Sequence, residues 1–157
     1  MEEGIVFKKF TLPMCHAFWK NYAADPDMMD QDYVYDPEWV EHYYRSKICS
    51  DSYRVFAICA DEKVVGEVML KRIDPEKGCA TLSIHFANDA YKNRGYGTAA
   101  ERYMIDYGFH QLGLNTIYAD CVHRNKRSQH VLEKVGFRFV REDDTFRYYE
   151  IKRPVSD

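Results

Sequence analysis

The feature that most constrains this chain is a glycine-containing junction at residues 91–100, with the sequence YKNRGYGTAA. The preceding residues, 80–86, alternate as in a strand, and the stretch from Thr98 to Leu112 is rich in helix formers. Gly95 and Gly97 have no side chains, so the backbone N–H groups at the start of the helix can point outward together. The junction therefore predicts a strand, a tight loop and a helix whose first amides are exposed.

An anion suits this junction. The first amides of a helix lie at the positive end of its dipole, and Lys92 and Arg94 add two basic side chains nearby. Together these groups are suited to bind a phosphate or a pyrophosphate. The alternative is a loop that only begins a helix, because short glycine motifs are weak signals. The surrounding sequence has to decide between the two interpretations.

Length and composition favour a single domain spanning residues 1–157. A chain of 157 residues can bury a sizeable core, and an aromatic content of 15% is typical of a globular protein. The net charge of −3 indicates no general affinity for nucleic acid or anionic membranes. No secretory signal and no membrane-spanning stretch is apparent, and the five cysteines include no CxxC pair. We therefore expect a cytoplasmic protein with reduced thiols and no metal site.

The order of the expected elements indicates a mixed α/β fold. Thr11 and Asp36 are suited to cap two helices near the N-terminus, and Gly136 is suited to end the last helix in a left-handed conformation. The expected strands are residues 5–10, 53–60, 64–73, 79–86, 116–122, 137–140 and 146–151, and the two expected later helices are residues 98–112 and 128–135. An antiparallel meander would then lead into the glycine junction, and the next helix would connect two parallel strands.

Two motifs together resemble one known family. Residues 92–97, KNRGYG, are similar to the pyrophosphate loop Gln/Arg-x-x-Gly-x-Gly/Ala of the GNAT N-acetyltransferases, with lysine at the first position. Residues 125–137, NKRSQHVLEKVGF, resemble the second half of that domain, where Asn-x-x-Ser leads into a helix ending Glu-Lys-x-Gly-Phe. The Leu-Glu-Lys version is frequent in groups that acetylate protein N-termini or ribosomal proteins. The similarity is clear over residues 64–139.

The resemblance implies the GNAT fold, a mixed and mostly antiparallel sheet with two splayed central strands, and acetyl-CoA as the cofactor. Asn125 matches a family asparagine that contacts the cofactor, although a turn residue or a helix cap is the alternative. Ser128 is either a cap or a cofactor contact. The cofactor-binding residues that the resemblance implies are His85, Phe86, Ala87, Lys92, Asn93, Arg94, Gly95, Tyr96, Gly97, Thr98, Asn125 and Ser128.

The acid and base of the transfer are less well defined by the sequence. Many family members have a tyrosine four residues before the glycine of Gly-Phe, where this chain has Leu132, so Ser128, water or the solution would protonate the leaving thiolate. Glu67 and His85 are the candidate bases, and a solvated strand residue and a structural histidine are the respective alternatives. Many family members have a glutamate in this strand, and the matching position in this chain is Thr81.

The acceptor amine is expected to meet the polar, acidic and aromatic loop at residues 25–36. Carboxylates beside aromatic rings can attract a cationic amine, and the candidate substrate-binding residues are Tyr33, Tyr35 and Asp32. A solvated acidic loop is the alternative. The expected partner is a small-molecule or peptide amine, with no nucleic acid and no membrane, and exposed tyrosines are compatible with a homodimer.

The sequence thus predicts an acyltransferase, an acetyl-CoA-dependent N-acetyltransferase that acts by direct transfer to a primary amine of a small molecule or a protein N-terminus. No cysteine is placed with a base, which disfavours an acyl-enzyme route. The alternative from another class is a non-catalytic acyl-CoA-binding or sensing module, because the tyrosine and the strand glutamate of the family are both absent.

Overall fold

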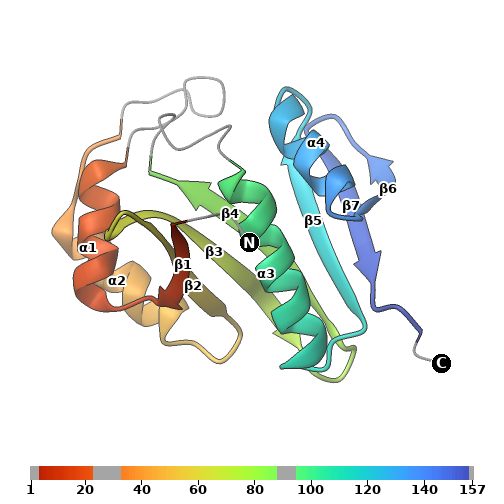
Figure 1. Ribbon diagram of the computed structural model, residues 1–157, viewed down its shortest axis with the longest axis horizontal. Coiled ribbons are helices and arrows are strands. Elements are labelled where there is room, and N and C mark those ends of the chain that lie inside the picture. The colour runs from red at the N-terminus through yellow and green to blue at the C-terminus, as the bar shows by residue number, and fades with distance from the viewer. Residues whose placement is uncertain (1–3, 23–32, 88–94, 156–157) are drawn as a thin grey trace.

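The computed structural model describes residues 4–22, 33–87 and 95–155. The described strands form one seven-stranded sheet, and helices cover both faces of this sheet (Figure 1). The strands are β1 (Ile5–Lys9), β2 (Arg54–Ala60), β3 (Lys63–Asp74), β4 (Cys79–Phe86), β5 (Thr116–Val122), β6 (Arg138–Glu142) and β7 (Phe146–Lys152). Their order across the sheet is β1-β2-β3-β4-β5-β7-β6.

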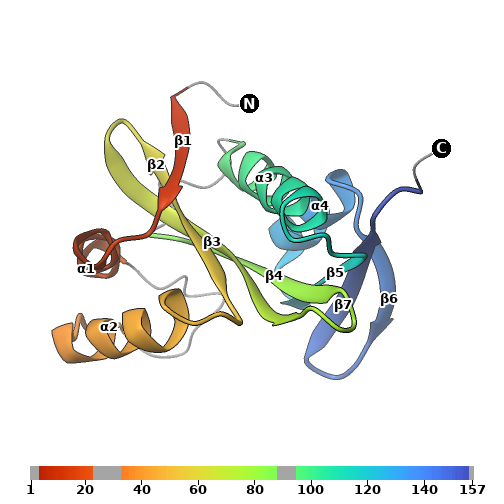
Figure 2. The same ribbon diagram turned by 90° about the horizontal axis from the view of Figure 1, so that it is seen from below.

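The helices divide between the two faces of the sheet. They are α1 (Leu12–Asn21), α2 (Pro37–Tyr43), α3 (Tyr96–His110) and α4 (Lys126–Lys134), and a π-helix, η1 (Tyr44–Ile48), continues α2. Figure 2 shows α1 and α2 on one face and α3 and α4 on the other. Each face of the sheet is therefore shielded by a different pair of helices.

The helix ends agree with the capping signals. Thr11 accepts a hydrogen bond from the Met14 amide, and Asp36 accepts from the Glu38 and Trp39 amides. Gly136 has a φ of 110°, which confirms its left-handed conformation. Helix α3 begins two residues before the expected Thr98, because Gly95 with a φ of 79° already serves as its N-cap.

The sheet is antiparallel except between β4 and β5. The meander of β1 to β4 pairs in sequence, and the hairpin of β6 and β7 pairs on the far side of β5. Strands β4 and β5 run parallel, but only Cys79–Thr81 pairs with Thr116–Tyr118. Beyond that point the two strands diverge (Figure 1), which confirms the expected splay. The later residues of β4 consequently have a free edge on the β5 side.

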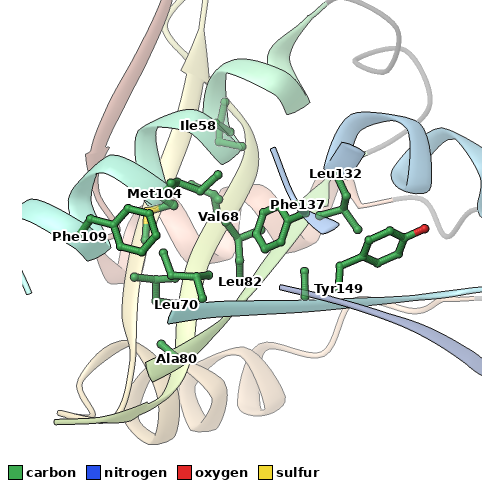
Figure 3. Close-up of a cluster of buried hydrophobic side chains, with 14 of the residues drawn as sticks. Ile58, Val68, Leu70, Ala80, Leu82, Met104, Phe109, Leu132, Phe137 and Tyr149 are labelled. Carbon is green, nitrogen blue, oxygen red and sulfur yellow. The ribbon is translucent and has the colours of Figure 1, made fainter. Parts of the chain in front are cut away.

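Two hydrophobic clusters hold the layers together. The first packs α3 and α4 on the sheet and contains Ile58, Val68, Leu70, Ala80, Leu82, Met104, Phe109, Leu132, Phe137 and Tyr149 (Figure 3). The second packs α1 and α2 on the opposite face, with Phe10, Cys15, Phe18, Trp19, Val40, Tyr43, Val55 and Met69 among its members. Leu132 is 2% exposed, in agreement with a core role.

The free cysteines agree with the expectation of reduced thiols. The five cysteines are free thiols, and those of Cys15, Cys59 and Cys121 are buried. Burial raises the pKa of Cys121, the cysteine nearest to the second motif, so this thiol is not activated. Among the described residues, no helix has the length and apolar character needed to cross a membrane.

Candidate active site

The start of α3 is built as an anion site. Gly95 adopts the left-handed conformation that a side chain would strain, and no side chain in the described part of the chain caps this helix. The first amides of the 15-residue helix, including those of Gly97 and Thr98, therefore have no partner within the helix. Their dipole favours a negatively charged group. The other loop candidates, Lys92, Asn93 and Arg94, lie outside the described residues.

The outer end of β4 lies beside this helix start. A Cβ atom at Gly97 would lie 3.7 Å from Cε2 of Phe86, so the strand end and the first turn of α3 are in contact. The Ala87 amide donates to the carbonyl of Val65 at 2.8 Å and is not available to a cofactor. Because hydrogen-bonding directions alternate along a strand, the N–H and C=O groups of Phe86 face the unpaired β5 side. The expected backbone pairing with the cofactor therefore centres on Phe86.

Glu67 on β3 is a buried carboxyl group and not a solvated strand residue. The side chain is 0% exposed because α2 covers this face of the sheet. The Tyr43 hydroxyl donates to Oε1 of Glu67 at 2.6 Å, and Oε2 of Glu67 has no hydrogen-bond partner within the described ranges. Burial raises the pKa of Glu67 to about 7, although the Tyr43 hydrogen bond and the charge of Lys47 act in the opposite direction. This carboxyl group can therefore exchange a proton near neutral pH.

His85 is the direct cross-strand partner of Glu67. The two residues are in register between β3 and β4, so their side chains project from the same face of the sheet. His85 is exposed, and its Nε2 lies 3.5 Å from the Ser83 hydroxyl. Surrounding protein atoms and the charges of Lys71 and Lys47 lower the pKa of His85 to about 4. Solvent screens part of this effect at an exposed residue, but its direction keeps the imidazole neutral at pH 7.

The second motif forms the start of α4. Asn125 is the N-cap, and its Oδ1 accepts from the Ser128 amide at 3.0 Å. The cap interpretation is thus confirmed, while the amide Nδ2 of Asn125 makes no hydrogen bond among the described residues. The Ser128 side chain lies close enough to the buried Cys121 thiol to lower the pKa of that thiol, against the effect of burial. Asn125 and Ser128 both lie at the start of the helix that follows β5 in the chain.

The candidate substrate residues pack against α1. Tyr33 contacts the rings of Trp19 and Tyr22 at centroid distances of 5.9 Å and 4.9 Å. The Tyr35 hydroxyl lies 2.7 Å from Nδ1 of His16, and Nζ of Lys20 lies 5.5 Å from its ring centre. Asp32 and most of the acidic loop lie outside the described residues. These contacts give both tyrosines a structural role on the α1 and α2 face.

The sequence interpretation missed two groups on this face. The helical spacing of Tyr43 from Trp39 and Val40 indicates only an apolar helix face, yet the Tyr43 hydroxyl is the partner of Glu67. Lys71 is half-buried, and burial lowers the pKa of its ammonium group although Asp120 opposes the shift. The signal for Lys71 was the even spacing of residues 67, 69 and 71, which places them on one face of a strand.

Residues 7–138 match the acetyltransferase (GNAT) domain family, and the chain belongs to this family. The probable N-acetyltransferase YjcK of Bacillus subtilis is 33% identical over 96 residues, which cover 60% of this chain and 53% of that protein. The chain spans about half the length of this curated relative.

Two solved structures share the fold over nearly the whole chain. One is a chimera of the spermidine N-acetyltransferase SpeG of Vibrio cholerae and hSSAT, with a TM-score of 0.81, 17% identity and 96% coverage of each chain. The other is the Vibrio cholerae spermidine N-acetyltransferase in complex with CoA and spermine, with a TM-score of 0.77, 17% identity and 96% coverage of each chain.

The residues of this chain fit acetyl-CoA, the cofactor of GNAT acetyltransferases. The uncapped amides of α3 suit the pyrophosphate, and the free edge of Phe86 suits an amide-containing arm. The divergence of β4 and β5 leaves that edge without a strand partner. The expected GNAT fold and cofactor class are therefore confirmed.

Proposed function

We propose that this protein is an acetyl-CoA-dependent N-acetyltransferase that acts by direct transfer to a primary amine of a small molecule or a peptide terminus. The observation that carries the proposal is the pairing of a neutral His85 with the buried Glu67 at the end of β4 that adjoins the start of α3. Acetyl-CoA supplies the acetyl group as a thioester, and transfer forms a C–N bond and breaks the C–S bond.

His85 is the group that meets the acceptor amine in this proposal. The attacking amine must lose a proton, and a neutral, solvent-accessible imidazole can accept it. Glu67 lies beside His85 on the neighbouring strand β3. Its pKa of about 7 suits the Glu67 carboxylate to receive the proton from His85. Tyr43 orients the carboxyl group through its hydrogen bond to Oε1.

The leaving thiolate needs a proton from another side. Ser128 remains the protein candidate for this role, because its hydroxyl lies at the start of α4 and Leu132 offers no acid. The amides of Gly97 and Thr98 hold the pyrophosphate, and Asn125 has its Nδ2 group free among described partners to contact the arm.

The proposed acceptor is a cationic amine. The similarity to a spermidine N-acetyltransferase fold that was solved with spermine supports testing polyamines first, although that similarity extends to the fold alone. Tyr33 and Tyr35 on the α1 side and Asp32 are the proposed substrate contacts. A cytoplasmic location and a homodimer belong to the same proposal.

The proposal is tested by following thiol release from acetyl-CoA with spermidine, spermine, an aminoglycoside and a basic peptide as acceptors. We expect turnover with at least one amine, and His85→Gln should lower kcat about 100-fold or more while the Kd of acetyl-CoA changes less than about twofold. His110→Gln is the matched control, because this exposed histidine lies at the opposite end of α3.

Two results decide against the proposal. Binding of CoA without turnover of any amine would favour the non-catalytic acyl-CoA-binding or sensing module. If the His85→Gln variant turns over as fast as the wild type, His85 is not the general base and another group must accept the proton.

A further inference from the structure

Helix α3 carries a buried carboxyl group that the proposed reaction does not use. Glu101 is 2% exposed, although the adjacent Arg102 is exposed. Its Oε1 is buried and has no hydrogen-bond partner among the described residues. A sealed polar atom of this kind destabilises a fold by about 1–3 kcal/mol.

The carboxyl group lies on the side of α3 that faces β5 and α4. It is close enough to Cys121 of β5 to raise the pKa of that thiol, and Ser128 of α4 also lies close enough to Cys121 to affect the pKa of the thiol. Helix α3 packs against α4, and it also packs against β4 and β5. These two strands are the ones that diverge. Glu101 therefore shares its surroundings with Ser128, one of the proposed cofactor contacts, and lies on the helix whose first turn is the anion site.

An apolar residue would fill this position at lower free energy, since the surrounding side chains on α3 are Ala100, Met104 and Ile105. A buried polar atom without a hydrogen-bond partner needs an explanation. One explanation is that a bound ligand supplies the missing partner. We propose that Glu101 is a cofactor contact whose carboxyl group hydrogen-bonds to an amide of the arm of acyl-CoA.

The chemistry of the two groups is complementary. A carboxylic acid donates through its O–H group and accepts through its C=O group, and each amide of the arm offers one N–H donor and one C=O acceptor. Burial raises the pKa of Glu101 to about 8, so the acid form prevails at pH 7. Burial is the cause of this shift. Among the described residues, the titratable group that interacts with Glu101 from the packed elements is the Cys121 thiol, and Arg147 of β7 also affects that thiol.

This inference rests on the proposed function only for the identity of the cofactor. The test compares CoA with adenosine 3′,5′-diphosphate, which keeps the adenosine, the 3′-phosphate and one 5′-phosphate but lacks the arm. Isothermal titration calorimetry at pH 7 gives the Kd of both compounds for the wild type, Glu101→Leu and Glu101→Gln. Glu133→Gln is the control, because this exposed glutamate lies on the outer side of α4.

Glu101→Leu should weaken CoA about fivefold or more and leave the Kd of adenosine 3′,5′-diphosphate within about twofold. Glu101→Gln should keep most of the affinity for CoA, because an amide also donates and accepts. The melting temperature of free Glu101→Leu should rise above that of the wild type, since the unpaired carboxyl group is gone. A loss of stability together with an equal loss of affinity for both compounds would mean that Glu101 is structural, and unchanged CoA affinity in both variants would also overturn the inference.

The pH dependence supplies a second readout that does not rely on folding of the leucine variant. The acid form is the donor, so the affinity of the wild type for CoA should fall relative to that of Glu101→Gln as the pH rises from 7 to 9. A constant ratio over this range would contradict the inference. If the wild type binds neither compound, the assignment of CoA as the cofactor fails. If all variants bind CoA equally, the cofactor assignment stands and only the role of Glu101 fails.

Discussion

The hydrogen bond between Tyr43 and Glu67 shows what one residue contributes to this site. Burial raises the pKa of Glu67 to about 7, and the Tyr43 hydroxyl opposes that shift by stabilising the ionised form. The folded-state pKa thus exceeds the ordinary value of 4.5. The contribution of Glu67 to the free energy of unfolding is therefore full below about pH 4.5 and is lost as the pH rises through about 7.

Tyr43→Phe should therefore destabilise the protein more at pH 8 than at pH 5. At pH 5 the variant loses a hydrogen bond to a neutral acid, about 1 kcal/mol, and at pH 8 it loses a bond to a carboxylate, about 2–3 kcal/mol. Urea unfolding of both proteins at the two pH values measures the difference. Tyr118→Phe, at an exposed position of β5, should change stability little at either pH. A pH-independent effect of Tyr43→Phe would show that Glu67 does not titrate in this range.

The close approach of β3 and β4 is a property of these two elements. A Cβ atom at Gly66 would lie 2.8 Å from the His85 carbonyl oxygen and 3.0 Å from side-chain atoms of Ile58 and Phe86. The carbonyl oxygen is part of the paired backbone and cannot move without displacing the strand. Gly66 thus brings β3 against the segment of β4 that carries the proposed base and the cofactor edge.

Gly66→Ala should lower stability by about 2–4 kcal/mol and weaken CoA binding, because it pushes β4 away from β3. Urea unfolding and calorimetric titration with CoA measure the two effects. Gly113→Ala is the matched control: it has a φ of 67° and open space around it, so it should lose only about 1 kcal/mol and keep its CoA affinity. Equal losses in the two variants would refute the strand-spacing argument.

Ligand binding should stabilise the whole molecule, because the anion site and the strand edge belong to the folded state alone. At a CoA concentration about 100-fold above Kd, mass action adds about 2.7 kcal/mol, which corresponds to a rise of about 5–10 °C in Tm. Differential scanning fluorimetry with CoA measures this shift. NADH, which carries a pyrophosphate but no pantetheine arm, should give a much smaller one.

The Gly95→Asp variant should abolish the CoA-dependent rise in Tm, because a carboxylate would occupy the anion site at the start of α3. Gly113→Asp carries the same change at a left-handed position at the other end of the helix and should retain the rise. A full CoA-dependent rise in Tm for Gly95→Asp would show that the pyrophosphate does not bind at the start of α3.

Local signals explain why much of the fold could be predicted. Strands β4 and β5 have the expected bounds, and the caps at Thr11 and Asp36 lie where the sequence indicates them. His85 shares a face with Ser83 and lies opposite the face of Leu82, because side chains alternate along a strand. The anion site was predictable because Gly95 permits a conformation that other residues resist.

The burial of individual carboxyl groups could not be predicted in the same way. Glu67 is sealed by a tyrosine 24 residues earlier in the chain, on a helix packed against the opposite side from α3. Glu101 has no local signal at all, because a glutamate in a helix is usually exposed and only the packing of α3 against its neighbours buries it. Such burial depends on which elements meet, and this is not encoded in any short stretch.

The sequence by itself determined the elements, their caps, the glycine junction and the resemblance to a family, because these depend on side-chain period and local backbone preference. The tertiary structure alone decided that the pairing of β4 with β5 stops at Thr81, that the Ala87 amide is bonded to Val65, and that the carboxyl groups of Glu67 and Glu101 are removed from water. The physical reason is that hydrogen-bond pairing and desolvation arise between segments far apart in the chain, and they set the proton affinities on which the proposed chemistry depends.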